Sequence, residues 1–222
     1  MSELTLTREK YLSSPATASS LPFWKEESFT VPENMLIVGD EEYRRALSLD
    51  KNAFADYTDE PYFKLVFRPA ENRVERPDLP RGYALYSGTS KDFSEHIRLC
   101  YGGGPSEAEI ESYDRHPSHD PSLFIMLKDE KTGRIAASGR AELDPRIGEG
   151  ILEWIQVSPS ARRRGLGRFI VLELLWRMRD RAEFVTVSGM LNGESDPLAL
   201  YKSCGFGEMA VWHILRKASD KE

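Results

Sequence analysis

Three consecutive arginines precede a Gly-Leu-Gly sequence in the segment SARRRGLGRF, residues 160–169. The segment lies between two apolar runs, 151–157 and 169–178, which predict a strand and a helix. At such a junction the first N–H groups of the helix lack partners, and together with the helix dipole they attract an anion. Glycines let the backbone approach that anion closely, and arginines supply charge-assisted hydrogen bonds. The junction therefore predicts a binding site for a phosphate group, most naturally a pyrophosphate.

Two common phosphate-binding motifs do not match this junction. A P-loop requires Lys and then Ser or Thr after its last glycine, where this sequence has Arg168 and Phe169. The dinucleotide fingerprint G-x-G-x-x-G opens the first βαβ unit, whereas Gly165 and Gly167 stand alone and late in the chain. The junction therefore matches neither the P-loop nor the dinucleotide-binding class of nucleotide site.

The elements around the junction follow from apolar periodicity and turn residues. Residues 1–33 are polar and without a period, which predicts a mobile arm or an irregular wrap over the surface. The proline-rich residues 68–82 predict a linker. The other expected elements are a strand at 35–38, a helix at 40–54, a strand or short helix at 61–67, a strand at 82–88, capped helices at 90–102 and 106–116, a β-hairpin at 122–144, a strand at 150–158, a helix ending near 182, a strand at 184–190, a helix at 196–204 and a strand at 210–217.

Two motifs resemble those of one superfamily. The segment VSPSARRRGLG, residues 157–167, resembles the acetyl-CoA signature of the GNAT superfamily of N-acetyltransferases, Gln/Arg-x-x-Gly-x-Gly/Ala after a strand, with Arg162, Gly165 and Gly167 at its fixed positions. The segment NGESDPLALYKSCGF, residues 192–206, resembles the later motif of that superfamily. The resemblance covers about residues 81–217. It implies an α/β fold with a mixed central sheet flanked by helices, an acetyltransferase domain at 81–218, and an N-terminal α/β extension with its linker at 1–80.

The resemblance also implies the residues of the site. The strand before the glycine loop is bulged in this superfamily, and its backbone groups, here those of Ile155, Gln156 and Val157, would contact the thioester and the pantetheine arm. The general acid would be Tyr201, with ring packing as the alternative role. The residues implied at the pyrophosphate are Arg162, Arg163, Arg164, Gly165, Leu166, Gly167 and Arg168.

The general base is a separate expectation. Glu153 shares a strand face with Ile155 and Val157 and would receive a proton through a water molecule. Glu149 and His213 are competitors, and a structural role for Glu153 stays open. The resemblance implies acetyl-CoA as the cosubstrate. The cysteines and histidines show no metal-ligand spacing, so no metal is expected.

Composition limits the other classes of protein. The net charge of −6 argues against general nucleic-acid binding, and no apolar stretch has the roughly 18 residues of a membrane span. The start of the chain lacks the apolar centre of a signal peptide, and Cys100 and Cys204 are too few for a disulfide scaffold. The sequence therefore predicts a cytoplasmic protein without nucleic-acid or membrane partners, and a homodimer is left open.

The resemblance implies transfer of an acetyl group to a primary amine. The transfer is expected to be direct, because no Ser/His or Cys/His pairing marks a nucleophile. Residues 105–154, which are expected to form one wall of the acceptor site, contain eleven Asp and Glu against six Lys and Arg. This acidic wall is expected to favour a small cationic amine or a peptide end as the acceptor. The alternative is a non-catalytic module that binds or senses acyl-CoA.

Overall fold

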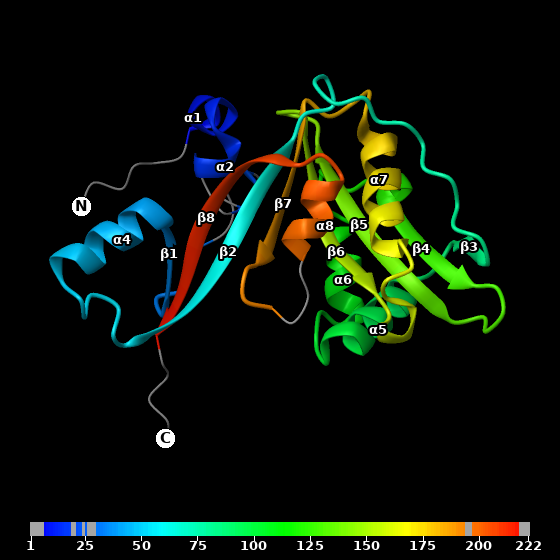
Figure 1. The fold of residues 1–222 in the computed structure, drawn as a ribbon, viewed down its shortest axis with the longest axis horizontal. Coiled ribbons are helices and arrows are strands. Elements are labelled where there is room, and N and C mark those ends of the chain that lie inside the picture. Colours follow the sequence, from blue (N-terminus) through cyan, green and yellow to red (C-terminus); the bar gives the residue numbers. More distant parts are fainter. Residues whose placement is uncertain (1–6, 19–20, 24, 26–29, 194–196, 218–222) are drawn as a thin grey trace. The chain divides into compact units, whose positions relative to one another are not determined.

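The computed structural model describes residues 7–18, 21–23, 25, 30–193 and 197–217, and the chain divides into two compact units. The first unit joins Met1–Phe67 to Thr186–Lys202 and Phe206–Glu222, and the second comprises Arg68–Val185 and Ser203–Gly205. Both units combine strands with helices (Figure 1), which confirms the α/β prediction. Within the described residues, no helix has both the length and the apolar character needed to cross a membrane. The expected division at residue 80 stays a prediction, and the units divide the chain differently.

The sheet of the second unit has antiparallel neighbours in the order β6-β5-β4-β3. The strands are β3 (Tyr83–Tyr86), β4 (Phe124–Asp129), β5 (Ile135–Asp144) and β6 (Glu149–Val157). The predicted hairpin is confirmed, because β4 pairs with β5 across a turn in which the Asp129 carboxylate accepts hydrogen bonds from the backbone N–H groups of Lys131 and Thr132.

Helices cover both faces of this sheet. They are α5 (Ser90–Tyr101), α6 (Glu107–Tyr113) and α7 (Leu166–Met178), and α5 and α6 each begin with the capping box that their sequences predict. Successive residues of a strand point to opposite faces, and Ser138 contacts His96 of α5 while Gly139 lies under Ile170 of α7. The helices α5 and α7 therefore lie on opposite faces (Figure 1).

The proline-rich segment contains neither helix nor strand between residues 68 and 82, as expected. It also packs within the second unit. The Arg76 guanidinium lies 4.5 Å from the ring centroid of Trp176 and 3.5 Å from a carboxylate oxygen of Glu173, both on α7. The segment is therefore attached to α7 by a cation–π contact and an ion pair.

The first unit contains the strand order β1-β8-β2-β7. The expected strand or short helix at 61–67 is part of the eleven-residue strand β2, which pairs antiparallel with β8. The strand β7 begins in the second unit at Phe184 and Val185 and continues in the first. The elements are α1 (Arg8–Ser13), α2 (Pro15–Ala18), β1 (Met35–Gly39), α4 (Asp40–Leu49), β2 (Tyr57–Phe67), β7 (Phe184–Met190), α8 (Pro197–Ser203) and β8 (Gly207–Lys217).

The prediction of a mobile or irregular arm at 1–33 is wrong for the described part of that segment. Helices α1 and α2 form there, and Tyr11 is fully buried with its ring centroid 5.5 Å from that of Phe23. The buried Lys64 ammonium of β2 donates a hydrogen bond of 2.9 Å to the Tyr11 hydroxyl. The sequence is polar, and these few aromatic residues fix it to the sheet.

Candidate active site

The strand that leads into the arginine and glycine junction is bulged. Pairing of β5 with β6 runs from Ser138 opposite Gln156 to Arg140 opposite Glu153, so the single residue Gly139 faces two residues of β6. One of those two, Trp154, has a positive φ of 51°, which is rare for a residue with a bulky side chain. A bulge frees backbone groups from the ladder and changes the direction of the strand. The structure therefore has a bulge where the resemblance places one.

The side chains at the bulge lie on opposite faces of the sheet. Trp154 packs against the buried cluster of Phe93 and Ile97 of α5, while Ile155 lies over Gly139 together with Ile170 of α7. On the α5 side, the Tyr101 hydroxyl donates a hydrogen bond of 3.2 Å to the carbonyl oxygen of Ile155. The bulge is thus supported from both faces.

The backbone of the junction has the form of an anion site. Gly165 is the N-cap of α7 with φ +79° and makes no side-chain cap, and Arg163 also has a positive φ of 64°. Left-handed residues in a turn direct successive N–H groups into one concavity. A Cβ added at Gly165 would have nothing within 4 Å, so the space beside this backbone is open. Leu166 is buried, so only its backbone is available to a ligand.

The four arginines of the junction have different environments. All four are exposed (Arg162, Arg163, Arg164 and Arg168), and they differ in their hydrogen bonds. Arg164 donates hydrogen bonds to the Tyr83 hydroxyl at 3.1 Å and to the carbonyl oxygen of Ser160 at 3.1 Å, and Arg168 donates to the carbonyl oxygen of Ser203. Arg164 and Arg168 therefore also connect the arginine loop, residues 158–168, to its surroundings.

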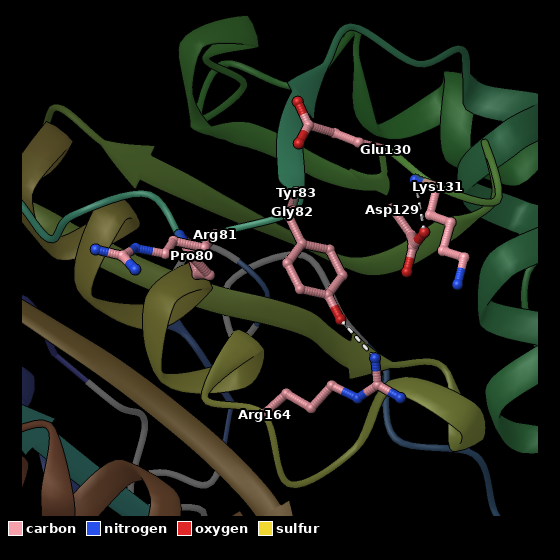
Figure 2. A pocket seen from close by; sticks show the side chains of 8 residues that line it. All are labelled: Pro80, Arg81, Gly82, Tyr83, Asp129, Glu130, Lys131 and Arg164. Atoms are coloured by element: carbon pink, nitrogen blue, oxygen red, sulfur yellow. Dashed lines mark hydrogen bonds between the residues drawn. The ribbon is translucent and has the colours of Figure 1, made fainter.

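A pocket of about 650 Å³ lies beside Arg164 (Figure 2). Its lining residues are Pro80, Arg81, Gly82, Tyr83, Asp129, Glu130, Lys131 and Arg164. Figure 2 shows the Arg164 guanidinium directed at the Tyr83 hydroxyl from the opposite side of the pocket. Tyr83 and Lys131 were not expected near the loop, because they belong to a strand and a turn far from it in the sequence.

The three candidate bases differ in accessibility. Glu153 is half-buried and lies opposite Arg140 next to the bulge, whereas Glu149, at the start of β6, is fully buried. His213 belongs to the first unit, where its Nδ1 lies 3.0 Å from the Asp59 carboxylate and its Nε2 lies 3.3 Å from that of Asp40. Both ring nitrogens of His213 thus face carboxylates, and the assignment of Glu153 as the base stays a prediction.

The expected general acid lies in the first unit, whereas Glu153 and the loop lie in the second. Tyr201 is buried, and its ring centroid lies 6.0 Å from that of Phe63 and 5.7 Å from that of Phe206. Ring packing of Tyr201 is thus present in the structure, and its role as acid stays a prediction.

A Cys/His pairing is present, contrary to expectation. Cys100 Sγ lies 3.6 Å from His96 Nε2, four residues away on α5. Burial raises the pKa of the Cys100 thiol to about 11 and lowers the pKa of His96 to about 4. Both groups are therefore neutral near pH 7, unlike the thiolate and imidazolium of an activated cysteine. The spacing H-x-x-x-C on a predicted helix was the signal for this pair.

Comparison with known proteins agrees with this geometry. The model of the acetyltransferase (GNAT) family matches residues 90–206, more than half of the chain. Among solved structures, a GCN5-related N-acetyltransferase from Sphaerobacter thermophilus is similar with a TM-score of 0.66, at 14% identity, over 85% of this chain and 61% of that one. This second likeness concerns the fold alone.

Two curated relatives are named for acetyl transfer. Mycothiol acetyltransferase of Mycobacterium ulcerans is 29% identical over 181 residues, covering 68% of this chain and 56% of that protein. Beta-lysine N(6)-acetyltransferase of Methanosarcina mazei is 24% identical over 182 residues, covering 79% of this chain and 61% of that protein. The chain thus spans little more than half the length of these relatives. From the match of the family model, the chain belongs to the GNAT family of acetyltransferases.

Proposed function

We propose that this protein transfers an acetyl group from acetyl-CoA directly to a primary amine. The observation that carries the proposal is the continuity of two features, a bulged strand at Trp154 and an open helix N-terminus at Gly165, eleven residues later. The loop offers N–H groups, open space and four exposed arginines, of which Arg164 and Arg168 also tie the loop to its surroundings, and these features suit a pyrophosphate. When bound, acetyl-CoA supplies a thioester carbonyl as the electrophile.

The residues of the chain would then manage protons and position. Glu153 would take the proton of the incoming ammonium through a water molecule, so that the amine nitrogen can form the new bond to carbon. Backbone groups at Ile155, Gln156 and Val157 would hold the carbonyl oxygen and the pantetheine arm, and N–H donors there would stabilise developing negative charge. Tyr201 would protonate the sulfur as the C–S bond breaks, and the second proton that the nitrogen loses on forming the amide would restore the Tyr201 hydroxyl through solvent. The high pKa of Cys100 supports direct transfer, since an enzyme-bound acyl thioester requires a thiolate.

The acceptor is proposed to be a small cationic amine or a peptide end. Arg140 NH1 lies 3.2 Å from the Asp114 carboxylate, Arg140 NH2 lies 3.6 Å from that of Glu142, and Glu153 is opposite Arg140 in the sheet. Two carboxylates contact this guanidinium and Glu153 is its neighbour across the sheet, so the acids here outnumber this cation and favour a further cation nearby. Other acids of the expected wall have partners, because Asp144 pairs with Arg146 and Asp120 with Arg181. The attraction is thus expected from the Arg140 cluster.

The name of one relative supports this class of acceptor. It is named for the N6 amine of β-lysine, whose side-chain amine is protonated at neutral pH. The test is release of the CoA thiol from acetyl-CoA with a panel of amines, including β-lysine, polyamines, amino sugars and acidic amino acids. Turnover with cationic amines that weakens as salt rises would support the proposal. Binding of CoA without turnover on any amine would instead favour a non-catalytic acyl-CoA-binding module.

A further inference from the structure

A buried polar network connects α5 to the end of β6. His96 of α5 has Nδ1 2.6 Å from the hydroxyl oxygen of Ser138 and Nε2 2.9 Å from that of Ser158. The Gln156 side-chain amide donates to the same Ser138 oxygen at 2.6 Å. None of these four side chains is more than 4% exposed. Each hydrogen bond in the network is therefore shielded from water. If one of them were lost, a buried polar group without a partner would lower the free energy of unfolding.

The hydrogen bonds of this network determine which atom donates and which accepts at each contact. The Ser158 hydroxyl donates to the carbonyl oxygen of Ile135 at 2.8 Å, and a carbonyl can only accept. The oxygen of Ser158 must then accept from His96, which places the imidazole proton on Nε2. His96 Nδ1 is left as an acceptor for the Ser138 hydroxyl, whose oxygen accepts from Gln156. With a neutral imidazole, all of these contacts are satisfied together only in this arrangement.

The two ends of the network lie at the two parts of the candidate site. Gln156 directly follows the bulge, and its backbone is among the groups expected at the thioester. Ser158 follows β6, and the short 3-10 helix Pro159–Ala161 connects it to Arg162. Its backbone N–H also donates to the carbonyl oxygen of Ala136 at 2.9 Å. The network thus fixes the start of the arginine loop relative to the bulge.

We propose that His96 is a positioning residue, whose imidazole holds the strand after the bulge and the first residue of the arginine loop in one register through Ser138 and Ser158. The inference rests on the proposed function, since the register matters where the bulge and the loop bind parts of one ligand. His96 is hydrogen-bonded to Ser138 and Ser158, and it acts on the candidate site through these two serines.

The first test is nitrogen NMR of the imidazole in the unliganded wild-type protein. The expected spectrum shows a protonated Nε2 and an unprotonated Nδ1, and it shows no titration of His96 between pH 8 and pH 5. A proton on Nδ1 would overturn the proposal, because the direction of the network would be reversed. Titration near pH 6.5 would also overturn it, because the ring would then be accessible to water.

The second test is calorimetric binding of CoA to variants that remain folded by circular dichroism. Ser158→Ala and His96→Leu are expected to weaken CoA binding by about 10-fold, the effect of one lost buried hydrogen bond. His96→Gln keeps an N–H in the place of Nε2 and is expected to retain more affinity than His96→Leu. The matched control is Ser94→Ala, a buried serine of the same helix whose hydroxyl donates to the carbonyl oxygen of Pro105.

The outcomes separate this inference from the proposed function. Wild-type affinity for CoA in Ser158→Ala and His96→Leu would overturn the role of His96, whatever amines are acetylated. If His96→Leu does not fold, Ser158→Ala decides the same point. If the variants and the spectrum behave as expected but no amine is acetylated, the proposed function fails and the positioning role stands.

Discussion

Gly139 of β5 lies against Ile155 of the bulge so closely that a Cβ at position 139 would be 2.7 Å from Cδ1 of Ile155. The same Cβ would lie 2.3 Å from Cγ2 of Ile170 on α7. A side chain at this position would therefore have to displace the bulge, the helix or both. The register of the strands at the bulge and the packing of α7 on the sheet therefore depend on this glycine.

Gly139→Ala is expected to lower the free energy of unfolding by about 1–3 kcal/mol, the usual range for overpacking a core. Chemical denaturation measures this change. Gly103→Ala is the matched control, because a Cβ at Gly103 would have nothing within 4 Å. Equal stability of the two variants would show that the bulge can move without strain.

Stability is expected to fall as the pH decreases from about 6.5 to 4. Burial lowers the pKa of His96 to about 4, below its value of 6.5 in an unfolded chain. In this window the unfolded state binds a proton that the folded state does not, so His96 contributes a loss of up to about 1.4 kcal/mol per pH unit. Denaturation of wild type and His96→Gln across the window measures it, and identical pH dependence would contradict the assignment.

Removal of residues 1–80 tests the predicted domain division. That division separates β8 from both β1 and β2, its antiparallel partners. Leu215 of β8 is fully buried in the whole chain, and without β1 and β2 its strand would expose apolar surface and two unpaired edges. A chain that begins at Arg81 is expected to aggregate, as size-exclusion chromatography would show. A soluble, monomeric product that binds CoA would instead establish the first 80 residues as an accessory.

Tyr201→Phe is expected to reduce kcat by about 10²- to 10⁴-fold with little change in KM for acetyl-CoA, because only the proton donor is removed. The ring contacts with Phe63 and Phe206 remain, so the variant should keep its fold, which circular dichroism would check. Tyr86→Phe, which removes a hydroxyl bonded to Asp92, controls for loss of a tyrosine hydroxyl. Wild-type turnover in Tyr201→Phe would leave this tyrosine with a packing role only.

The fold class and the elements from Tyr83 to Val157 could be predicted because their signals are local. Alternating apolar residues marked β4 and β5, and Thr89 with Asp92 formed the expected capping box. The helices near the N-terminus were missed because their stability depends on distant contacts. Trp212 of β8, for example, donates a hydrogen bond from its indole to the carbonyl oxygen of Ala16.

The candidate site was predictable only where a motif is contiguous. The sequence indicates Gly165 and the arginines, but Gly139 and Ser138 belong to a different strand and become neighbours of Gln156 only through the register of the sheet. His96 showed no ligand spacing, and its role in the network depends on burial between two serines. Such relationships are set by tertiary structure, which single-sequence patterns do not encode.

The central claim is that the Gly165 loop holds the pyrophosphate of acetyl-CoA, and calorimetric titration of CoA into Gly165→Asn and Gly165→Asp tests it most directly. The two side chains have nearly the same size, and both tolerate the left-handed backbone at this position better than most residues do. They differ in charge, so a phosphate beside residue 165 should be repelled by Asp alone. We predict that Gly165→Asp weakens CoA binding at least about 10-fold more than Gly165→Asn does. Wild-type affinity in both variants would contradict the claim.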